Sequence, residues 1–147
     1  MSGANVLITG ASSGIGEAVA DRFRAAGAHV FLTGRRTEAP ESLQRGERYL
    51  SGDLGDESFV AELVAAATAE LGPLDTVVAC HGLQAEGAVT EMPLETASRV
   101  LDANLLSTFS LLKHAVPAIR EGGGAIVLVS SRLGIVGIPD QVMYTAA

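Results

Sequence analysis

Five short apolar runs, rich in β-branched residues and separated by longer stretches of helical spacing, constrain the fold of this chain most. The runs cover residues 5–9, 29–33, 48–51, 76–80 and 125–130, the third being the weakest. Their apolar residues are continuous instead of alternating with polar ones, which is typical of parallel strands covered by helices on both faces. The sequence therefore predicts an α/β fold with a parallel sheet.

The stretches between the runs predict the connections. Residues 14–26 and 56–71 have helical spacing, and Pro93 opens a long helical stretch to about Arg120. Residues 35–53 are short for a full helix, so we expect only one or two helical turns, around residues 41–45. Right-handed crossovers then favour a Rossmann-like doubly wound sheet of strand order 3-2-1-4-5, which binds ligands at the carboxyl ends of strands one and four.

Composition narrows the classes of function. The 147 residues indicate one domain, residues 1–147, and 48% hydrophobic residues exclude wholesale disorder. A net charge of −7 argues against a nucleic-acid partner. The single cysteine, Cys80, excludes an internal disulfide, and we expect it to be a small buried residue of a protein in a reducing compartment. Without a signal peptide or a long apolar span, the sequence predicts a cytoplasmic protein with no membrane partner.

A glycine-rich turn follows the first predicted strand and opens the first predicted helix. Glycines at this place let the backbone approach a pyrophosphate, whose negative charge the free N–H groups and the helix dipole favour. The spacing is GxxxGxG, and a βα turn that uses glycines only to bend is the alternative. The predicted cofactor-binding residues of this turn are Gly10, Ser12, Ser13, Gly14, Ile15 and Gly16.

Two arginines, Arg35 and Arg36, end the second predicted strand. At this place a dinucleotide fold puts an acid on a free ribose 2′-hydroxyl or an arginine on a 2′-phosphate. A guanidinium pairs with phosphate through charge-assisted hydrogen bonds. We therefore expect NADP(H) to be preferred over NAD(H). The alternative is a solvated loop in which Glu38 partners one arginine.

The sequence resembles the short-chain dehydrogenase/reductase family along essentially its whole length. The family's cofactor turn reads TGxxxGIG, as residues 9–16 do, and a serine and a tyrosine stand 13 positions apart after the fifth strand. The matching positions outside the turn are Asp53, Leu54, Asn104, Ser131 and Tyr144.

The resemblance implies an enzyme that interconverts a carbonyl and an alcohol of a small-molecule substrate by hydride transfer. It implies Tyr144 as the acid/base, Ser131 as the residue that orients the substrate oxygen, and Asn104 as part of the proton relay. It places Asp53 and Leu54 beside the adenine ring. It also implies a homo-oligomer in the full-length form.

Two departures from the family pattern stand out. The turn after the fourth strand, usually NNAG, reads Ala-Cys-His-Gly, so Gly82 is kept and His81 is new. No other metal ligand stands at metal spacing around His81, so we expect no metal site and interpret it as a turn histidine beside the cofactor.

The second departure is that the family's lysine, four residues beyond Tyr144, falls after the last residue, Ala147. The fifth strand would also form an unprotected edge. We therefore expect an N-terminal portion of such an enzyme, lacking its later strands, with little activity by itself. A catalytically inactive nucleotide-binding or interaction module is the alternative function.

Overall fold

A five-stranded parallel sheet forms the centre of the protein, whose structure, a computed structural model, describes residues 3–147. The strand order is β3-β2-β1-β4-β5, which confirms the predicted order 3-2-1-4-5 and the α/β, Rossmann-like class. The strands are β1 (Asn5–Thr9), β2 (His29–Gly34), β3 (Arg48–Ser51), β4 (Thr76–Ala79) and β5 (Ala125–Leu128).

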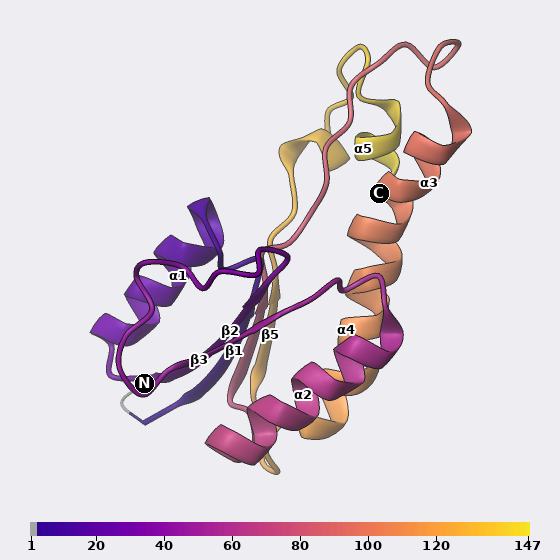
Figure 1. The fold of residues 1–147 in the computed structure, drawn as a ribbon. Coiled ribbons are helices and arrows are strands. Elements are labelled where there is room, and N and C mark those ends of the chain that lie inside the picture. The colour runs from indigo at the N-terminus through magenta and orange to yellow at the C-terminus, as the bar shows by residue number, and fades with distance from the viewer. Residues whose placement is uncertain (1–2) are drawn as a thin grey trace.

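Helices cover the two faces of this sheet unequally. Figure 1 shows α1 (Gly14–Ala25) on one face and α2 (Glu57–Leu71) together with α4 (Ser107–Ala115) on the other. The remaining helical segments are α3 (Leu94–Leu101), η1 (Asp102–Leu106), η2 (Val116–Ala118), η3 (Arg132–Gly134) and α5 (Val142–Ala146). None of the helices within residues 3–147 combines the length and apolar character needed to cross a bilayer.

Each face of the sheet has its own core. Val6 and Ile8 of β1 pack with Ala20 of α1, whereas Leu7, between them, packs with Leu63 of α2 and with residues of α4. Successive residues of a strand point to opposite faces, so a continuous apolar run fills both cores. This explains why the central strands carry no polar alternation.

The connection between β2 and β3 contains no helix, so the helical turns predicted around residues 41–45 are wrong. The chain instead makes two tight turns, in which Leu43 N–H donates to Pro40 O over 2.9 Å and Glu47 N–H donates to Gln44 O over 3.1 Å. Most helical stability in proteins comes from packing of an apolar face. Leu43 is the one long apolar side chain in this connection, and it alone cannot hold a helix against the sheet.

The long helix predicted from Pro93 to about Arg120 is continuous only as far as Ala118 and is not uniformly α-helical. Between α3 and α4 lies η1, a π-helical turn that contains Asn104, and the N–H of Ser107 closes it on the carbonyl of Asp102. A π-turn inserts an extra residue into the helix and often marks a functional site.

The strand β5 forms one edge of the sheet, and it is uncovered. Val127 and Leu128, which point to opposite faces, are 47% and 46% exposed. The unprotected edge that the sequence predicted is therefore present in the described structure.

Candidate functional site

A cavity of about 1120 Å³ opens at the carboxyl ends of the strands, where β1 and β4 lie side by side. Doubly wound sheets bind ligands at such a switch point. All twelve residues predicted to bind a cofactor line this cavity, namely Gly10, Ser12, Ser13, Gly14, Ile15, Gly16, Arg35, Arg36, Asp53, Leu54, His81 and Gly82.

The glycine turn brings backbone close to the cavity in two different ways. Gly10 has φ +65°, and a Cβ there would lie 2.7 Å from the carbonyl carbon of Cys80, so this glycine lets the turns after β1 and β4 touch. Gly14 has φ +58°, and a Cβ there would meet no atom within 4 Å. The turn is therefore packed at Gly10 and open at Gly14.

The first turn of α1 presents uncapped backbone to this opening. Ser13 is the N-cap residue of α1, and its side chain makes no capping hydrogen bond. The first N–H groups of a helix lack partners within the helix and carry its positive dipole end. This end of α1 is therefore suited to an anionic group.

The arginines lie beside the glycine turn. Arg36 Nη1 donates to the carbonyl oxygen of Ser12 over 3.3 Å, and the hydroxyl of Tyr49 donates to the carbonyl oxygen of Arg36 over 2.7 Å. Arg35 is exposed, and within residues 3–147 neither arginine forms an ion pair, with Glu38 or any other residue. Neither guanidinium group is therefore held in an ion pair among these residues.

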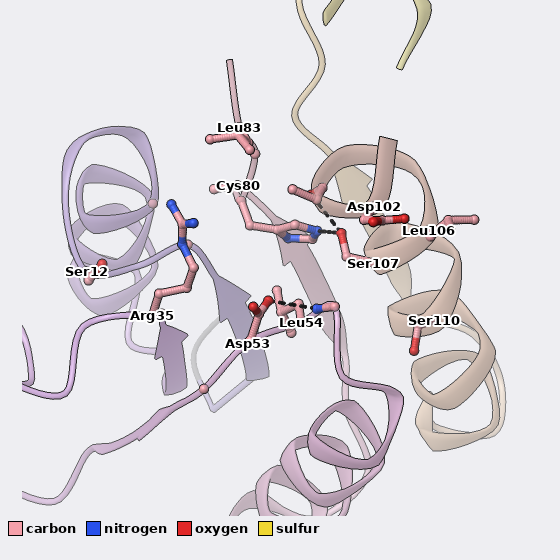
Figure 2. A pocket seen from close by; sticks show the side chains of 18 of the residues that line it. Ser12, Arg35, Asp53, Leu54, Cys80, Leu83, Asp102, Leu106, Ser107 and Ser110 are labelled. Carbon is pink, nitrogen blue, oxygen red and sulfur yellow. Dashed lines mark hydrogen bonds between the residues drawn. The ribbon is translucent and has the colours of Figure 1, made fainter. Parts of the chain in front are cut away.

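Figure 2 shows Ser12 and Arg35 on one side of the cavity, Asp102, Leu106, Ser107 and Ser110 across from them, and Asp53 and Leu54 between. Asp53 Oδ1 accepts a hydrogen bond from Gly55 N–H over 2.9 Å. Leu54 is only 7% exposed and belongs to the core that α2 covers. Asp53 and Leu54 therefore place a hydrogen-bonded carboxylate next to an apolar side chain at the cavity.

His81 is partly buried and lines the cavity. Its Nδ1 lies 2.6 Å from Thr9 Oγ1, and its Nε2 lies 3.0 Å from Ser107 Oγ. Burial lowers the pKa of His81 to about 4, because the charged imidazolium loses hydration there. The imidazole is therefore neutral near pH 7.

Asn104 is held by the backbone after β4. Its Oδ1 accepts from Leu83 N–H and its Nδ2 donates to Leu83 O, both over 2.8 Å. Asn104 does not itself line the cavity, although its neighbours Ala103 and Ser107 do.

The structure does not place Ser131 or Tyr144 on the lining of the cavity. Ser131 precedes η3 and its Oγ accepts from Leu133 N–H over 3.2 Å. Tyr144 lies in α5, which packs against α3 and η3. Figure 1 shows α5 beyond the carboxyl ends of the strands, beside α3. The catalytic roles of both residues stay predictions.

One wall of the cavity was missed by the sequence reasoning. It is the face of α3, η1 and α4 that contributes Arg99, Asp102, Ala103, Leu106, Ser107, Phe109, Ser110 and Lys113. Spacings of three and four residues put these positions on one side of a helix. This spacing could have been used to predict that they face the cavity together. Lys113 Nζ is bound to Glu57 Oε1 over 2.6 Å, so its charge is already paired.

Cys80 also lines the cavity and is only partly buried, so the expectation of a buried cysteine is wrong. The backbone of Cys80 packs closely against Gly10, and its side chain packs in part against the core that α1 covers. Burial still raises the pKa of the Cys80 thiol, which disfavours the reactive thiolate. Within residues 3–147, no three His, Cys, Asp or Glu side chains gather as metal ligands would.

Known proteins resemble this chain in sequence and in fold. A family model described as short chain dehydrogenase matches residues 4–147. The chain is 37% identical to glycine betaine reductase ATRR of Emericella nidulans and 34% identical to hydroxysteroid 11-beta-dehydrogenase 1-like protein A of Xenopus laevis. These alignments cover 100% and 99% of the chain but only 12% and 53% of the two relatives.

A solved structure of a short chain dehydrogenase from Mycobacterium smegmatis superposes with a TM-score of 0.89 at 25% identity. The superposition covers 99% of this chain and 64% of that one. The chain thus spans less than two thirds of the length of each of these three proteins.

Proposed function

The chain belongs to the short-chain dehydrogenase/reductase family, and from that premise we propose that it is an NADP(H)-dependent oxidoreductase that interconverts a carbonyl and an alcohol. The observation that carries the proposal is that one cavity, at the switch point of the sheet, collects the whole predicted cofactor-binding set. Its volume of about 1120 Å³ suits an elongated ligand such as a dinucleotide.

The residues present fit a dinucleotide phosphate. A pyrophosphate would lie over Gly14, where the space beside the backbone is open, against the uncapped first turn of α1. Leu54 is mostly buried but lines the cavity, so its exposed edge would contact an adenine ring. When bound, the nicotinamide supplies or accepts the hydride of the reaction.

The preference for NADP(H) rests on Arg35 and Arg36. Their charges are unpaired within the described residues, and Arg36 is anchored to the turn through the carbonyl of Ser12. A guanidinium beside a ribose 2′-phosphate forms charge-assisted hydrogen bonds that a 2′-hydroxyl cannot match.

In this proposal three residues act on the substrate and its proton. Tyr144 donates or accepts the proton on the substrate oxygen, and Ser131 holds that oxygen by a hydrogen bond. Asn104 takes part in the proton relay from its place in η1. The substrate is a small carbonyl compound or alcohol, and the full-length form is a homo-oligomer.

Equilibrium binding of NADPH and NADH to the 147-residue protein tests the cofactor arm of the proposal. We expect the wild type to prefer NADPH. Arg35→Ala should weaken NADPH binding by about ten- to a hundredfold, because a hydrogen bond to a charged group is lost, and should leave NADH binding nearly unchanged.

Arg45→Ala is the matched control, because Arg45 is an exposed arginine of the same connection that does not line the cavity. Its affinities for both nucleotides should equal those of the wild type. A wild-type preference for NADH, or equal loss of both nucleotides in Arg35→Ala, would overturn the assignment.

A further inference from the structure

A chain of hydrogen bonds with His81 at its centre links three elements that the proposed function leaves unconnected. His81 Nδ1 contacts Thr9 Oγ1 at the end of β1, over 2.6 Å. On the other side of the ring, Nε2 contacts Ser107 Oγ at the start of α4, over 3.0 Å. Ser107 Oγ in turn donates to Ala103 O within η1, over 2.8 Å.

The proton positions along this chain follow from the donors. A hydroxyl has one hydrogen, and Ser107 uses its own on Ala103 O, so its oxygen can only accept from His81. The hydroxyl oxygen of Thr108 lies 3.4 Å from the same ring nitrogen, and its hydrogen is likewise donated to Asn104 O. His81 Nε2 must therefore carry the proton, and Nδ1 accepts from Thr9.

The surroundings of the ring favour this neutral form. Thr9 is fully buried and Ser107 is 2% exposed, so both neighbours are shielded from water. A charged ring would be a donor at both nitrogens, and Thr9 would lose its acceptor. On the elements packed against His81, the charged groups that also line the cavity are Asp102 of η1 and Lys113 of α4. The pKa of the His81 ring is lowered by burial and not by either of these charges.

The hydrogen bonds around His81 connect two parts of the site, the glycine turn and the helix wall, whose relative position sets the shape of the cavity. On one side, a Cβ on Gly10 would come within 2.7 Å of the His81 backbone nitrogen, so the glycine turn rests on this residue. On the other side, Ser107 and Ala103 flank Asn104, whose side chain holds Leu83. The imidazole ring of His81 contacts both sides, through Thr9 at the end of β1 and through Ser107 at the start of α4.

We propose that His81 is a positioning residue which, in its neutral Nε2–H form, locks the cofactor-facing turn after β1 to the π-helical segment η1. The lock fixes the width of the cavity between the glycine turn and the helix wall. It also fixes the hydrogen bonds between Asn104 and Leu83. The nucleotide-binding part of the test rests on the proposed function, whereas the tautomer and exchange measurements do not.

The first measurement is of the ring itself. Long-range ¹H–¹⁵N correlation of the ¹⁵N-labelled protein near pH 7 reports the tautomer, and His81→Ala identifies the His81 signals by their absence. We expect the neutral Nε2–H pattern. An Nδ1–H tautomer or an imidazolium would overturn the proposal.

The second measurement follows the link into the helix. Ser107→Ala removes the acceptor of the His81 Nε2–H, and amide hydrogen exchange at Leu83 reports whether Asn104 still holds its place. We expect Leu83 to exchange about tenfold faster in this variant, while amides in the middle of α2 keep their wild-type rates. Unchanged exchange at Leu83 would contradict the link.

The third measurement separates a positioning role from simple filling of space. His81→Gln places an amide N–H where Nε2–H was, whereas His81→Asn places an acceptor where Nδ1 was. NADPH affinity should fall about tenfold in His81→Ala and His81→Asn and be restored in part by His81→Gln. Equal losses in all three variants would argue for packing alone and overturn the proposal.

His29→Gln is the control, because His29 is exposed at the amino end of β2, the opposite end of the strand from the cavity. It should leave the affinity and the exchange rates unchanged. If the wild type binds neither nucleotide, the proposed function fails, and the tautomer and Leu83 exchange still decide the role of His81.

Discussion

A histidine that folding removes from water makes the protein less stable as pH falls, because only the unfolded chain can take up the proton freely. For His81 the pKa is about 4 in the folded protein, against about 6.5 for an unperturbed histidine. Its contribution to stability is therefore fully present above about pH 6.5 and is lost as the pH falls toward 4.

This linkage gives a prediction at the scale of one residue. Between about pH 7 and pH 5.5, the free energy of unfolding should fall by about 1 kcal/mol more in the wild type than in His81→Gln, because the glutamine does not titrate. Urea unfolding at the two pH values measures the difference. The same dependence on pH in both proteins would show that His81 does not carry it, and His29→Gln serves as the histidine control.

Residue types and the family resemblance together predicted the set of candidate cofactor-binding residues. Glycine, serine and arginine at their spacings in the sequence predicted positions that all line one cavity. The partners of His81 were not predictable, because Thr9 and Ser107 are far from it along the chain and meet it only through sheet pairing and helix packing.

At the scale of the element, the turn between β1 and α1 combines two different demands on glycine. Gly10 needs both a positive φ and the absence of a Cβ, since backbone of the β4 turn lies against it. Gly14 needs the positive φ but faces open space. One turn thus contains a glycine that packs against backbone and a glycine that faces open space.

The two substitutions should therefore behave differently. Gly10→Ala should lower the free energy of unfolding by about 3 kcal/mol, because a side chain must push two turns apart in addition to adopting a strained φ. Gly14→Ala should cost only about 1 kcal/mol, from the positive φ, yet weaken NADPH binding strongly.

Urea unfolding and nucleotide binding on the same samples compare the two variants. If Gly10→Ala lowered the free energy of unfolding only slightly while Gly14→Ala lowered it strongly, the roles assigned to the two glycines would be reversed. If Gly14→Ala folds and binds NADPH like the wild type, the ligand does not pass over that glycine.

Helical elements were predictable in position but not in geometry. The spacing of apolar residues marked α1, α2 and the long helix after Pro93, because each buries one face on the sheet. Neither the π-turn at Asn104 nor the absence of a helix before β3 could be foreseen in this way. The first involves the contacts of Asn104 with Leu83, and the second a lack of apolar residues to pack.

At the scale of the whole molecule, the sheet ends in the uncovered edge strand β5. Val127 lies on the face that α1 covers elsewhere, since it pairs in register with Val78 of β4, yet it is 47% exposed. An exposed apolar edge offers unpaired backbone groups to another chain.

We expect the 147-residue protein to self-associate through this edge as its concentration rises. Val127→Lys should reduce association, because a lysine on an edge strand disfavours pairing with a second strand. Sedimentation velocity over a range of concentrations measures the effect. Val89→Lys, a change at another exposed valine but in a loop, is the matched control. Equal association in all three proteins would show that β5 is not the contact.

Local features of the sequence were enough to predict the class of fold, the strand order and a glycine-rich turn that lines the cavity. These depend on local properties: apolar runs that need two covered faces, glycines that permit positive φ, and arginines that carry charge. Only the folded chain shows which helix face lines the cavity and which hydroxyl groups lie beside the two ring nitrogens of His81. These depend on hydrogen bonds and burial between residues distant in the chain, such as Thr9 and Ser107, which become neighbours only when the sheet and helices pack.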